Sequence, residues 1–497
     1  MSKPFLIAID QGTTGSRVFC FDTAGKVLST AYREFTQHFP KPGWVEHDAM
    51  EIWTGVCSLL AEALSKGGLD AKNAAGIGIT NQRETCVVWD RKTGEPVHRA
   101  IVWQCRRTAD FCEELKKRGL ADEVRKKTGL VIDAYFSGTK IRWFLENVAG
   151  VRARAEKGEL MAGTIDTWLL YRLTGEWKTD YTNASRTLLY NINKKKWDED
   201  LCKTLNVPIG LLPEVQASRS RFGTTKKVPG LPDGLPVLSI AGDQQAALFG
   251  QLCVKPGQAK NTYGTGCFLL FQTGQKFIIS KSGLLTTLAV DEKGGVSYAL
   301  EGSVFIGGAV IQWLRDFMKF FASARETEDI IKNIKDDEDD VVFVPAFAGL
   351  GAPHWDMQAR GAVFGLTRDT DPARMTRAAL KSIALQSHDL VRAMEKDTGE
   401  KLPSLRVDGG ATANHYLMQF QSDILNCPVE RPQNADTTAL GVAYLAGMEA
   451  GIWKNVDDLL KLQEDRTIFR PAMHAERRER ELRYWNKGVE RVKNWSE

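Results

Sequence analysis

A carboxylate followed by a turn rich in glycine and threonine stands close to the amino terminus. In the stretch IAIDQGTTGSRVFCFD (7–22), an apolar run ends on Asp10, crosses the turn at 12–15 and resumes as an alternating apolar run. Glycine lets backbone N–H groups approach an anion closely, and threonine hydroxyls add further donors. Such a turn can cradle a phosphate without a helix, although a Gly-Thr turn alone is more often just a hairpin.

Three more glycine-rich turns lie in the second half of the chain. The stretch NTYGTGCFLLF (261–271) repeats the first arrangement, and the pairs at 307–308 and 409–410 each precede a helical pattern. The repeated Gly-Thr hairpins predict two related domains that face each other, the second of which holds a nucleotide. Because the chain has no Walker-type GxxxxGK[ST] motif, these turns would have to hold the phosphates.

Three charged side chains have the chemistry of a small-molecule site. Arg83 and Glu84 lie in a short loop between two apolar segments, where fixed donors and acceptors could read hydroxyl groups. Their alternative role is a surface ion pair. Asp243 follows the apolar stretch PVLSIAG and precedes a helical pattern. A carboxylate at the end of a strand is well placed as a base or a metal partner, or it simply caps the helix.

The composition is that of an ordinary globular protein. The chain has 497 residues, of which 43% are apolar and 26% charged, so we expect two or three domains. The net charge of +4 and the small basic clusters predict no nucleic-acid partner. Nine cysteines without CxxC spacing give no disulfide framework or metal site. No apolar run is long enough for a signal peptide or a membrane helix, so we expect a cytoplasmic protein without membrane insertion.

The sequence pattern predicts that these residues are positioned by the helices and strands of an α/β fold. Asp48 and Glu51 form a capping box ahead of one helix, and Asp371 with Pro372 starts a long helix that ends at Gly399. The Pro-, Gly- and Lys-rich stretch 206–236 predicts a surface connection to a second domain, and the charged tail from 475 predicts an amphipathic helix. Alternating apolar patterns predict short strands at 5–9, 17–21, 27–33, 75–80 and 85–90.

Seven motifs in colinear order resemble those of the glycerol kinases, within the carbohydrate-kinase family. They are IDQGTTGSR, GITNQRET, WQCRRTAD, YFSGTKIRW, IAGDQQAALFGQL, NTYGTGCF and LRVDGGATAN. That family has the actin-like, hexokinase-like ATPase fold. The resemblance therefore implies an α/β protein of two actin-like/ribonuclease H-like ATPase domains facing each other across a catalytic cleft. The first, 1–245, would bind polyol and phosphate, and the second, 246–497, the nucleotide.

The resemblance also implies roles for individual residues. Glycerol hydroxyls would be bound by Arg83, Glu84, Tyr135, Asp243 and Gln244, and its carbons by Trp103 and Phe268. The ATP phosphates would be met by Thr13, Thr14, Gly15, Arg17 and Thr265, and the nucleoside by Gly308, Gln312, Gly410 and Asn414. Asp10, with Asp243, would hold Mg²⁺, and Asp243 would act as the catalytic base. At Gly15 the family more commonly has serine.

The activity implied is ATP-dependent phosphorylation of glycerol to sn-glycerol 3-phosphate, with ADP as the other product, by a homodimer or homotetramer. This reaction is the entry step of glycerol catabolism. One alternative is another polyol or sugar kinase of the same family, although Trp103 and Phe268 favour a three-carbon substrate over a pentulose. The other is an ATP-switched binding protein of the actin or chaperone type, in which Arg83, Glu84 and Asp243 would have no role.

Overall fold

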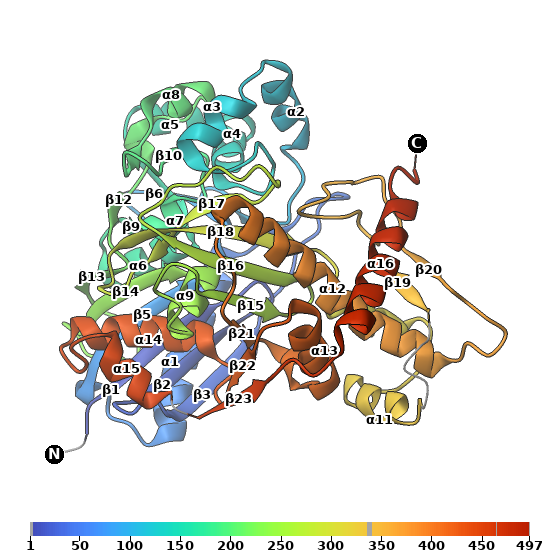
Figure 1. The fold of residues 1–497 in the computed structure, drawn as a ribbon. Coiled ribbons are helices and arrows are strands. Elements are labelled where there is room, and N and C mark those ends of the chain that lie inside the picture. Colours follow the sequence, from blue (N-terminus) through green and yellow to red (C-terminus); the bar gives the residue numbers. More distant parts are fainter. Residues whose placement is uncertain (1–2, 335–339, 464, 497) are drawn as a thin grey trace.

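Two large sheets organise the residues that the computed structural model describes, which are 3–334, 340–463 and 465–496 (Figure 1). The first has the order β13 (Arg219–Thr224), β14 (Pro236–Gly242), β5 (Ala74–Asn81), β1 (Phe5–Gln11), β2 (Gly15–Asp22) and β3 (Val27–Glu34). The second has the order β17 (Leu285–Val290), β18 (Val296–Val304), β16 (Cys267–Gly274), β15 (Ala259–Tyr263), β21 (Leu405–Asp408), β22 (Val429–Pro432) and β23 (Arg466–Phe469).

The two sheets repeat one topology. In the first, β1, β2 and β3 form an antiparallel meander, β5 and then β14 run parallel to β1, and β13 closes the edge antiparallel. In the second, β15, β16 and β18 are antiparallel neighbours, β17 precedes β18 in the chain and pairs on its outer side, β21 and β22 run parallel to β15, and β23 closes the edge. The two related α/β domains predicted from the Gly-Thr hairpins are therefore confirmed. Parallel neighbours end at one edge, so the turns that follow them are brought together.

Smaller sheets lie in both halves of the chain. A four-stranded sheet contains β4 (Glu46–His47), β7 (Ala100–Ile101), β6 (Cys86–Asp90) and β8 (Leu160–Thr164). Three strand pairs are β10 (Tyr190–Asn191) with β11 (Lys196–Trp197), β12 (Glu214–Gln216) with β9 (Lys178–Asp180), and β19 (Val342–Val344) with β20 (Ala362–Phe364). The predicted strands β1, β2, β3, β5 and β6 are confirmed.

Helices cover these sheets, and none among the described residues is both long and apolar enough to span a membrane. Those of the first half are α1 (Ala49–Gly67), α2 (Ala109–Lys117), α3 (Ala121–Thr128), α4 (Ser137–Asn147), α5 (Val151–Glu156), α6 (Ile165–Thr174), α7 (Tyr181–Ala184), α8 (Glu199–Thr204) and α9 (Asp243–Gly250). Those of the second are α10 (Ala309–Asp316), α11 (Thr327–Lys332), α12 (Pro372–Thr398), α13 (His415–Leu425), α14 (Thr437–Glu449), α15 (Val456–Leu462) and α16 (Ala475–Val492).

The predicted N-caps of α1 and α12 are confirmed, but the predicted capping box of α1 is not formed. Asp371 accepts a hydrogen bond from the N–H of Arg374 at the start of α12, and Gly399 ends the helix with φ of 73°. Asp48 caps α1 as expected. The carboxylate of Glu51, however, accepts from the N–H and the hydroxyl of Thr36 instead of completing a capping box. A partner from the segment after β3 has displaced the local one.

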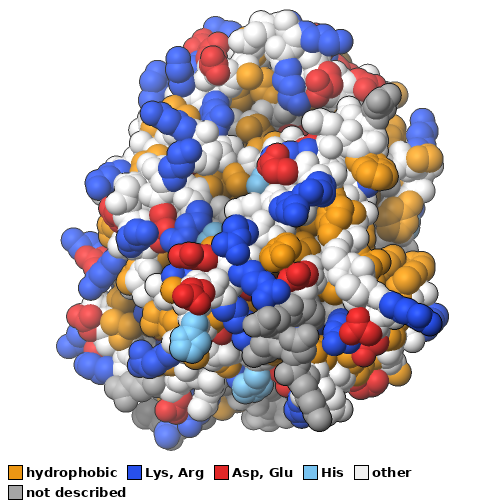
Figure 2. Space-filling model, turned by 45° about the vertical axis from the view of Figure 1, so that its right-hand side comes forward, with side chains coloured by type: hydrophobic (Ala, Val, Ile, Leu, Met, Phe, Trp, Pro, Cys, Tyr) orange, Lys and Arg blue, Asp and Glu red, His pale blue; other side chains and the backbone are white. Residues whose placement is uncertain are grey.

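The prediction for 206–236 is wrong in part. The segment is not only a surface connection, because it contains β12 and β13, and β13 forms an edge of the first sheet. Edge strands are rich in polar and charged residues, which hides them in sequence. The predicted amphipathic helix is α16, which packs on α12 and β19 of its own chain. Figure 2 shows basic and acidic side chains interspersed on the face that this side of the molecule presents.

Helices α9 and α14 cross at two glycines between the sheets. A Cβ atom on Gly441 would lie 1.9 Å from the carbonyl oxygen of Ala246, and one on Gly250 would lie 2.0 Å from that of Thr437. Helix α14 packs on β1, β5 and β14, whereas α9 also contacts β15 and β16 of the second sheet. Because Asp243 is the first residue of α9, this close crossing fixes where its carboxylate lies.

Substitution at this crossing should lower stability. A methyl group in Gly441→Ala has no space and must separate the helices, so we expect a loss of about 1–3 kcal/mol in the free energy of unfolding. Gly55, inside α1, is the control because no atom lies within 4 Å of its virtual Cβ. Gly55→Ala should instead stabilise by about 0.5–1 kcal/mol through helix propensity. Urea and thermal midpoints of both variants would test this, and an unchanged Gly441→Ala midpoint would contradict it.

Candidate active site

The carboxyl ends of β1, β5 and β14 bring the polar residues of the first half together. Asp10 pairs with Thr80 of β5, and the last residue of β14 pairs with Asn81. The turn at 12–15, the loop after β5 and Asp243 come directly after these pairs. Segments far apart in the sequence therefore meet at one edge of the first sheet, as ligand-binding segments do in parallel sheets.

Four charged side chains form a closed ring behind this edge. Arg83 donates from its two terminal nitrogens to Glu301 of β18, at 2.6 and 3.0 Å. Arg186, which follows α7, donates to Glu84 at 2.6 Å and to Glu301 at 3.0 Å. Nε of Arg83 lies 3.9 Å from Glu84, which closes the ring. Each side chain is at most 2% exposed, so opposite charges take the place of water.

The ring remains charged in spite of its burial. Burial alone would raise the pKa of Glu301, but Arg186 and Arg83 lower it to about 2. Burial likewise acts to lower the pKa of Arg83, and Glu301 and Glu84 instead raise it well above its ordinary value. Burial raises the pKa of Glu84, and Arg186 and Arg83 act against this rise. Two positive and two negative groups thus offset the cost of burying one another.

Asp243 lies beside the ring and is open to solvent. Its Oδ1 is 3.2 Å from Nε of Arg83 and accepts the N–H of Gln244 at 2.7 Å. The side chain is 32% exposed, unlike those of the ring. A carboxylate that is anchored on one side and accessible on the other can accept a proton from a bound hydroxyl group.

The two glutamines after Asp243 face different partners. Oε1 of Gln245 accepts from Arg83 at 3.2 Å, whereas Oε1 of Gln244 accepts from Nζ of Lys260 at 2.5 Å. Lys260 is a buried residue of β15, and burial lowers its pKa. The structure thus places Gln244 against the second sheet, and its contact with a polyol stays a prediction.

Two aromatic side chains of the first half lie close to the ring and the 12–15 turn. Trp103 and Tyr135 are half-buried and meet edge to face with ring centroids 5.5 Å apart. Nε1 of Trp103 donates to Oγ1 of Thr13 at 2.9 Å, which ties this wall to the 12–15 turn. Phe268 is half-buried on β16 of the second sheet.

The 12–15 turn is tight, and glycine is required at its end. The N–H of Gly12 donates to the carbonyl of Gly15 at 2.9 Å. A Cβ atom on Gly15 would lie 2.7 Å from the ring of Tyr32 and 2.8 Å from the carbonyl oxygen of Arg33. The serine that the resemblance leads us to expect would therefore not fit here. Thr14 is exposed at the tip of the turn.

Three carboxylates and one guanidinium lie beside this turn. Arg17 stacks on Tyr32 at 5.1 Å and contacts Asp436, the residue before α14, at 3.0 Å. Burial and the charge of Asp243 raise the pKa of Asp10 to about 7, and Arg17 acts against this rise. Carboxylates that repel each other in this way favour a bound cation.

The donor set fits Mg²⁺ better than a fully protein-coordinated metal. Among the described residues there is no group of three or more His, Cys, Asp or Glu side chains that could hold a metal ion. Mg²⁺ is usually bound by one or two carboxylates and completes its shell with water and phosphate oxygens. Asp10 and Asp243 have the chemistry for that arrangement.

The glycine turns of the second half also come together. The N–H groups of Gly307 and Gly308 donate to the carbonyls of Thr265 and Gly264, at 2.9 and 2.8 Å. Since β15 pairs in parallel with β21, the turn that follows β21 lies beside them. There Gly409 has φ of 91°, and a Cβ atom would lie 2.5 Å from a carbonyl oxygen of β15. At Gly409 the backbone is thus packed too closely for a side chain, so glycine is required there.

The remaining predicted nucleoside residues surround these turns. Gln312 of α10 and Gly410 are exposed. Asn414 already has protein partners, because its Oδ1 caps α13 through the N–H of Leu417 and its Nδ2 donates to Thr327. A contact between its side chain and a nucleoside stays a prediction.

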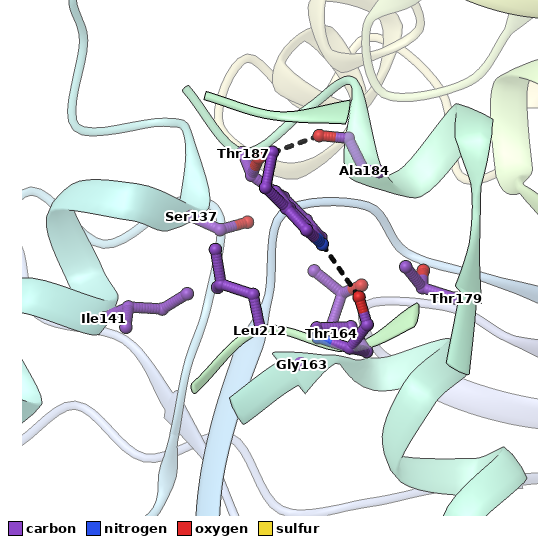
Figure 3. A pocket seen from close by; sticks show the side chains of 10 residues that line it. Ser137, Ile141, Gly163, Thr164, Thr179, Ala184, Thr187 and Leu212 are labelled. Atoms are coloured by element: carbon purple, nitrogen blue, oxygen red, sulfur yellow. Dashed lines mark hydrogen bonds between the residues drawn. The ribbon is translucent and has the colours of Figure 1, made fainter. Parts of the chain in front are cut away.

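A small cavity lies behind the ring (Figure 3). It measures about 10 Å³ and is lined by side chains such as Ser137, whose hydroxyl donates to the carbonyl of Glu84 at 3.0 Å. Thr187 and Ala184, joined by a hydrogen bond, form another wall. A cavity of this size holds at most one water molecule, so it is not the ligand site.

Sequence reasoning missed Arg186, Glu301, Gln245 and Lys260. For two of them a signal was present: Glu301 is a lone carboxylate in the apolar strand β18, and Lys260 is a lone cation in β15. A single charge on a strand that is otherwise buried needs a buried partner. Arg186 has no such signal, because it follows a short helix.

Known proteins share this architecture along the whole chain. Residues 5–250 match the N-terminal domain of the FGGY family of carbohydrate kinases, and residues 259–450 match the C-terminal domain of that family. The glycerol kinase of Leptospira biflexa is 61% identical over 493 residues, which is 99% of each chain.

Solved structures agree with the fold. The glycerol kinase of Plasmodium falciparum with ADP has a TM-score of 0.93 at 38% identity and covers 99% of this chain and 98% of its own. The ligand-bound xylulose kinase of Lactobacillus acidophilus, 22% identical, has a TM-score of 0.88 over 98% of this chain and 97% of its own, and so shares the fold. From both domain matches and the extent of the identity, this chain belongs to the FGGY family of carbohydrate kinases.

Proposed function

We propose that this protein transfers the γ-phosphate of ATP to a terminal hydroxyl of glycerol, giving sn-glycerol 3-phosphate and ADP. The observation that carries the proposal is the buried ring that presents Arg83 and Glu84 beside Asp243 and the 12–15 turn. Similarity to the glycerol kinases of Leptospira biflexa and Plasmodium falciparum supports the choice of substrate.

The ring leaves free hydrogen-bonding groups for a diol. Hydrogen bonds to Glu301 and Gln245 use three of the five N–H groups of Arg83, and its Nε lies 3.2 Å from Asp243. Among the described residues, one terminal N–H of Arg83 has no partner. Within the part of the chain that the structure describes, only one oxygen of Glu84 has a protein partner. One donor and one acceptor side by side match neighbouring hydroxyls, and the wall of Trp103 and Tyr135 suits a short carbon chain.

The chemistry needs one base and many donors. The terminal hydroxyl oxygen bonds to the γ-phosphorus, the bond to the β–γ bridging oxygen breaks, and the proton passes to Asp243. Arg17, Thr265 and the N–H groups of Thr13, Thr14 and Gly15 would stabilise the charge on the phosphoryl oxygens. Mg²⁺ held by Asp10 and Asp243 would neutralise part of the phosphate charge.

The two halves of the chain would bind different ligands. In this proposal, residues 1–245 bind the polyol and the phosphates, and residues 246–497 bind the nucleoside through Gly308, Gln312, Gly410 and Asn414. The cytoplasmic location and the assembly as a homodimer or homotetramer also belong to the proposal, because they rest on the resemblance.

A panel of acceptors separates the proposed activity from its alternatives. We expect ADP release in the presence of glycerol to exceed the rate without acceptor by at least about 10³-fold, because positioning dominates phosphoryl transfer. Release should be measured with glycerol, five-carbon polyols, ketopentoses and no acceptor. A preference for a ketopentose would indicate another sugar kinase, and equal rates without acceptor would exclude a kinase.

Removal of the base should abolish turnover selectively. Asp243→Asn keeps the size of the side chain but cannot take up the proton, so we expect kcat to fall by at least about 10²-fold. Binding of ADP should persist, as titration calorimetry would show. Asp200→Asn is the matched control, since that carboxylate is 71% exposed on α8. A near-normal kcat in Asp243→Asn would remove the assignment.

Neutralising one member of the ring should weaken polyol binding. Glu301→Gln leaves Arg83 and Arg186 buried with a single carboxylate, which should cost about 3–5 kcal/mol of stability. We expect KM for glycerol to rise at least about tenfold and KM for ATP to change less. Glu449→Gln is the control. It removes an ion pair with Arg219 whose side chains are about one-third exposed, and it should lower the free energy of unfolding by less than about 1 kcal/mol. Equal effects of both substitutions would contradict the role of the ring.

A further inference from the structure

A buried imidazole lies behind the 12–15 turn. His47, the last residue of β4, has no exposed surface and packs edge to face on Phe35 with ring centroids 4.8 Å apart. Its Nε2 is 2.8 Å from Oε1 of Gln37, and its Nδ1 is 3.3 Å from Nε2 of Gln82. Neither the polyol site nor the nucleotide turns use this residue.

The hydrogen bonds define one state of the imidazole. Nε2 of Gln37 donates to the carbonyl of Thr13, and Nε2 of Gln82 donates to that of Gly12, so both amide orientations are fixed by the backbone. Because Oε1 of Gln37 can only accept, Nε2–H of His47 donates to it, and in the neutral ring Nδ1 is then an acceptor that faces Nε2 of Gln82. Nε2 of Gln82 also lies 3.0 Å from Oε1 of Gln11, so its two N–H groups are shared among three acceptors. Burial, with a smaller effect of His38, lowers the pKa of His47 to about 3, which agrees with a neutral ring.

The two glutamines hold successive carbonyl groups of the turn toward the protein interior. The distances from their Nε2 atoms to the carbonyl oxygens of Gly12 and Thr13 are both 3.1 Å. Gln11 adds a second hydrogen bond to the carbonyl of Gly12 at 2.8 Å. In a trans peptide the C=O and the next N–H point in opposite directions. The N–H groups of Thr13 and Thr14 therefore point away from the imidazole, and Thr14 is exposed.

We propose that His47 is a positioning residue for the phosphate-binding turn. Through Gln37 and Gln82 it holds the two carbonyls inward, and so directs the N–H groups of Thr13 and Thr14 toward the phosphoryl oxygens of the nucleotide. One side chain that is both donor and acceptor sets both amides, which no aliphatic or purely donating residue can do. The inference rests on the proposed function, because it assumes that the turn binds phosphate.

The test compares nucleotide and polyol binding. His47→Phe keeps the ring contact with Phe35 and removes both hydrogen bonds. We expect its Kd for ADP with magnesium, measured by titration calorimetry, and its KM for ATP to rise about tenfold, as for the loss of one charge-assisted hydrogen bond. KM for glycerol should rise less than KM for ATP, because the ring keeps its contacts and the turn meets the aromatic wall only through the hydrogen bond from Trp103 to Thr13.

A second variant keeps the test decisive if His47→Phe does not fold. Gln37 is half-buried, so Gln37→Leu disturbs packing less, and it releases the carbonyl of Thr13 directly. It should raise the Kd for ADP by a similar factor. In the double variant, the Kd for ADP should rise by less than the product of the two single-variant factors, because both substitutions break the same network.

Val56→Ala is the stability control, since Val56 belongs to the apolar core against which Phe35 packs and has no side-chain group that could join the hydrogen bonds of the turn. It should lower the melting temperature and leave the Kd for ADP unchanged. Equal Kd values for ADP in the wild-type protein, His47→Phe and Gln37→Leu would overturn the inference. A wild-type protein that binds ADP but phosphorylates no polyol would refute only the proposed function, whereas one that does not bind ADP would refute both.

Discussion

The buried ring of Arg83, Glu84, Arg186 and Glu301 is the constraint on which the rest of the site depends. A single buried charge would cost several kcal/mol, but two arginines alternating with two glutamates compensate one another's charge. Because Glu301 comes from the second sheet and the other three from the first half, the ring also joins the halves. In the proposed function, it holds Arg83 and Glu84 in place before the acceptor binds, which removes part of the entropy cost of binding.

Much of the fold was predictable because its signals are local. The meander from 5 to 33, the bounds of α12 and the glycine turns all follow from patterns within a few residues. The same holds for Asp243, whose place after an apolar strand is visible in the sequence. These features do not depend on knowing which strand lies next to which.

The parts that could not be predicted depend on contacts between distant segments. Glu301 stands 218 residues from Arg83, so only the order of strands brings them together. The capping box failed because Thr36 of a neighbouring segment took the carboxylate of Glu51. Glycine at position 15 likewise has its reason in Tyr32, which lies on the adjacent strand. A sequence pattern indicates which interactions a residue can make, whereas the order of strands and helices determines its partner.

Helix α14 has a consequence for how the chain is made. It belongs to the last quarter of the sequence, yet Val442 and Leu445 pack in one core with Leu6 and Phe19 of the first strands. During synthesis that face of the first sheet lacks the cover of α14 until residue 449 has left the ribosome. The nascent chain must therefore protect this apolar surface for most of its translation, by delayed pairing of strands or by a chaperone, and a fragment that ends before α14 would expose it permanently.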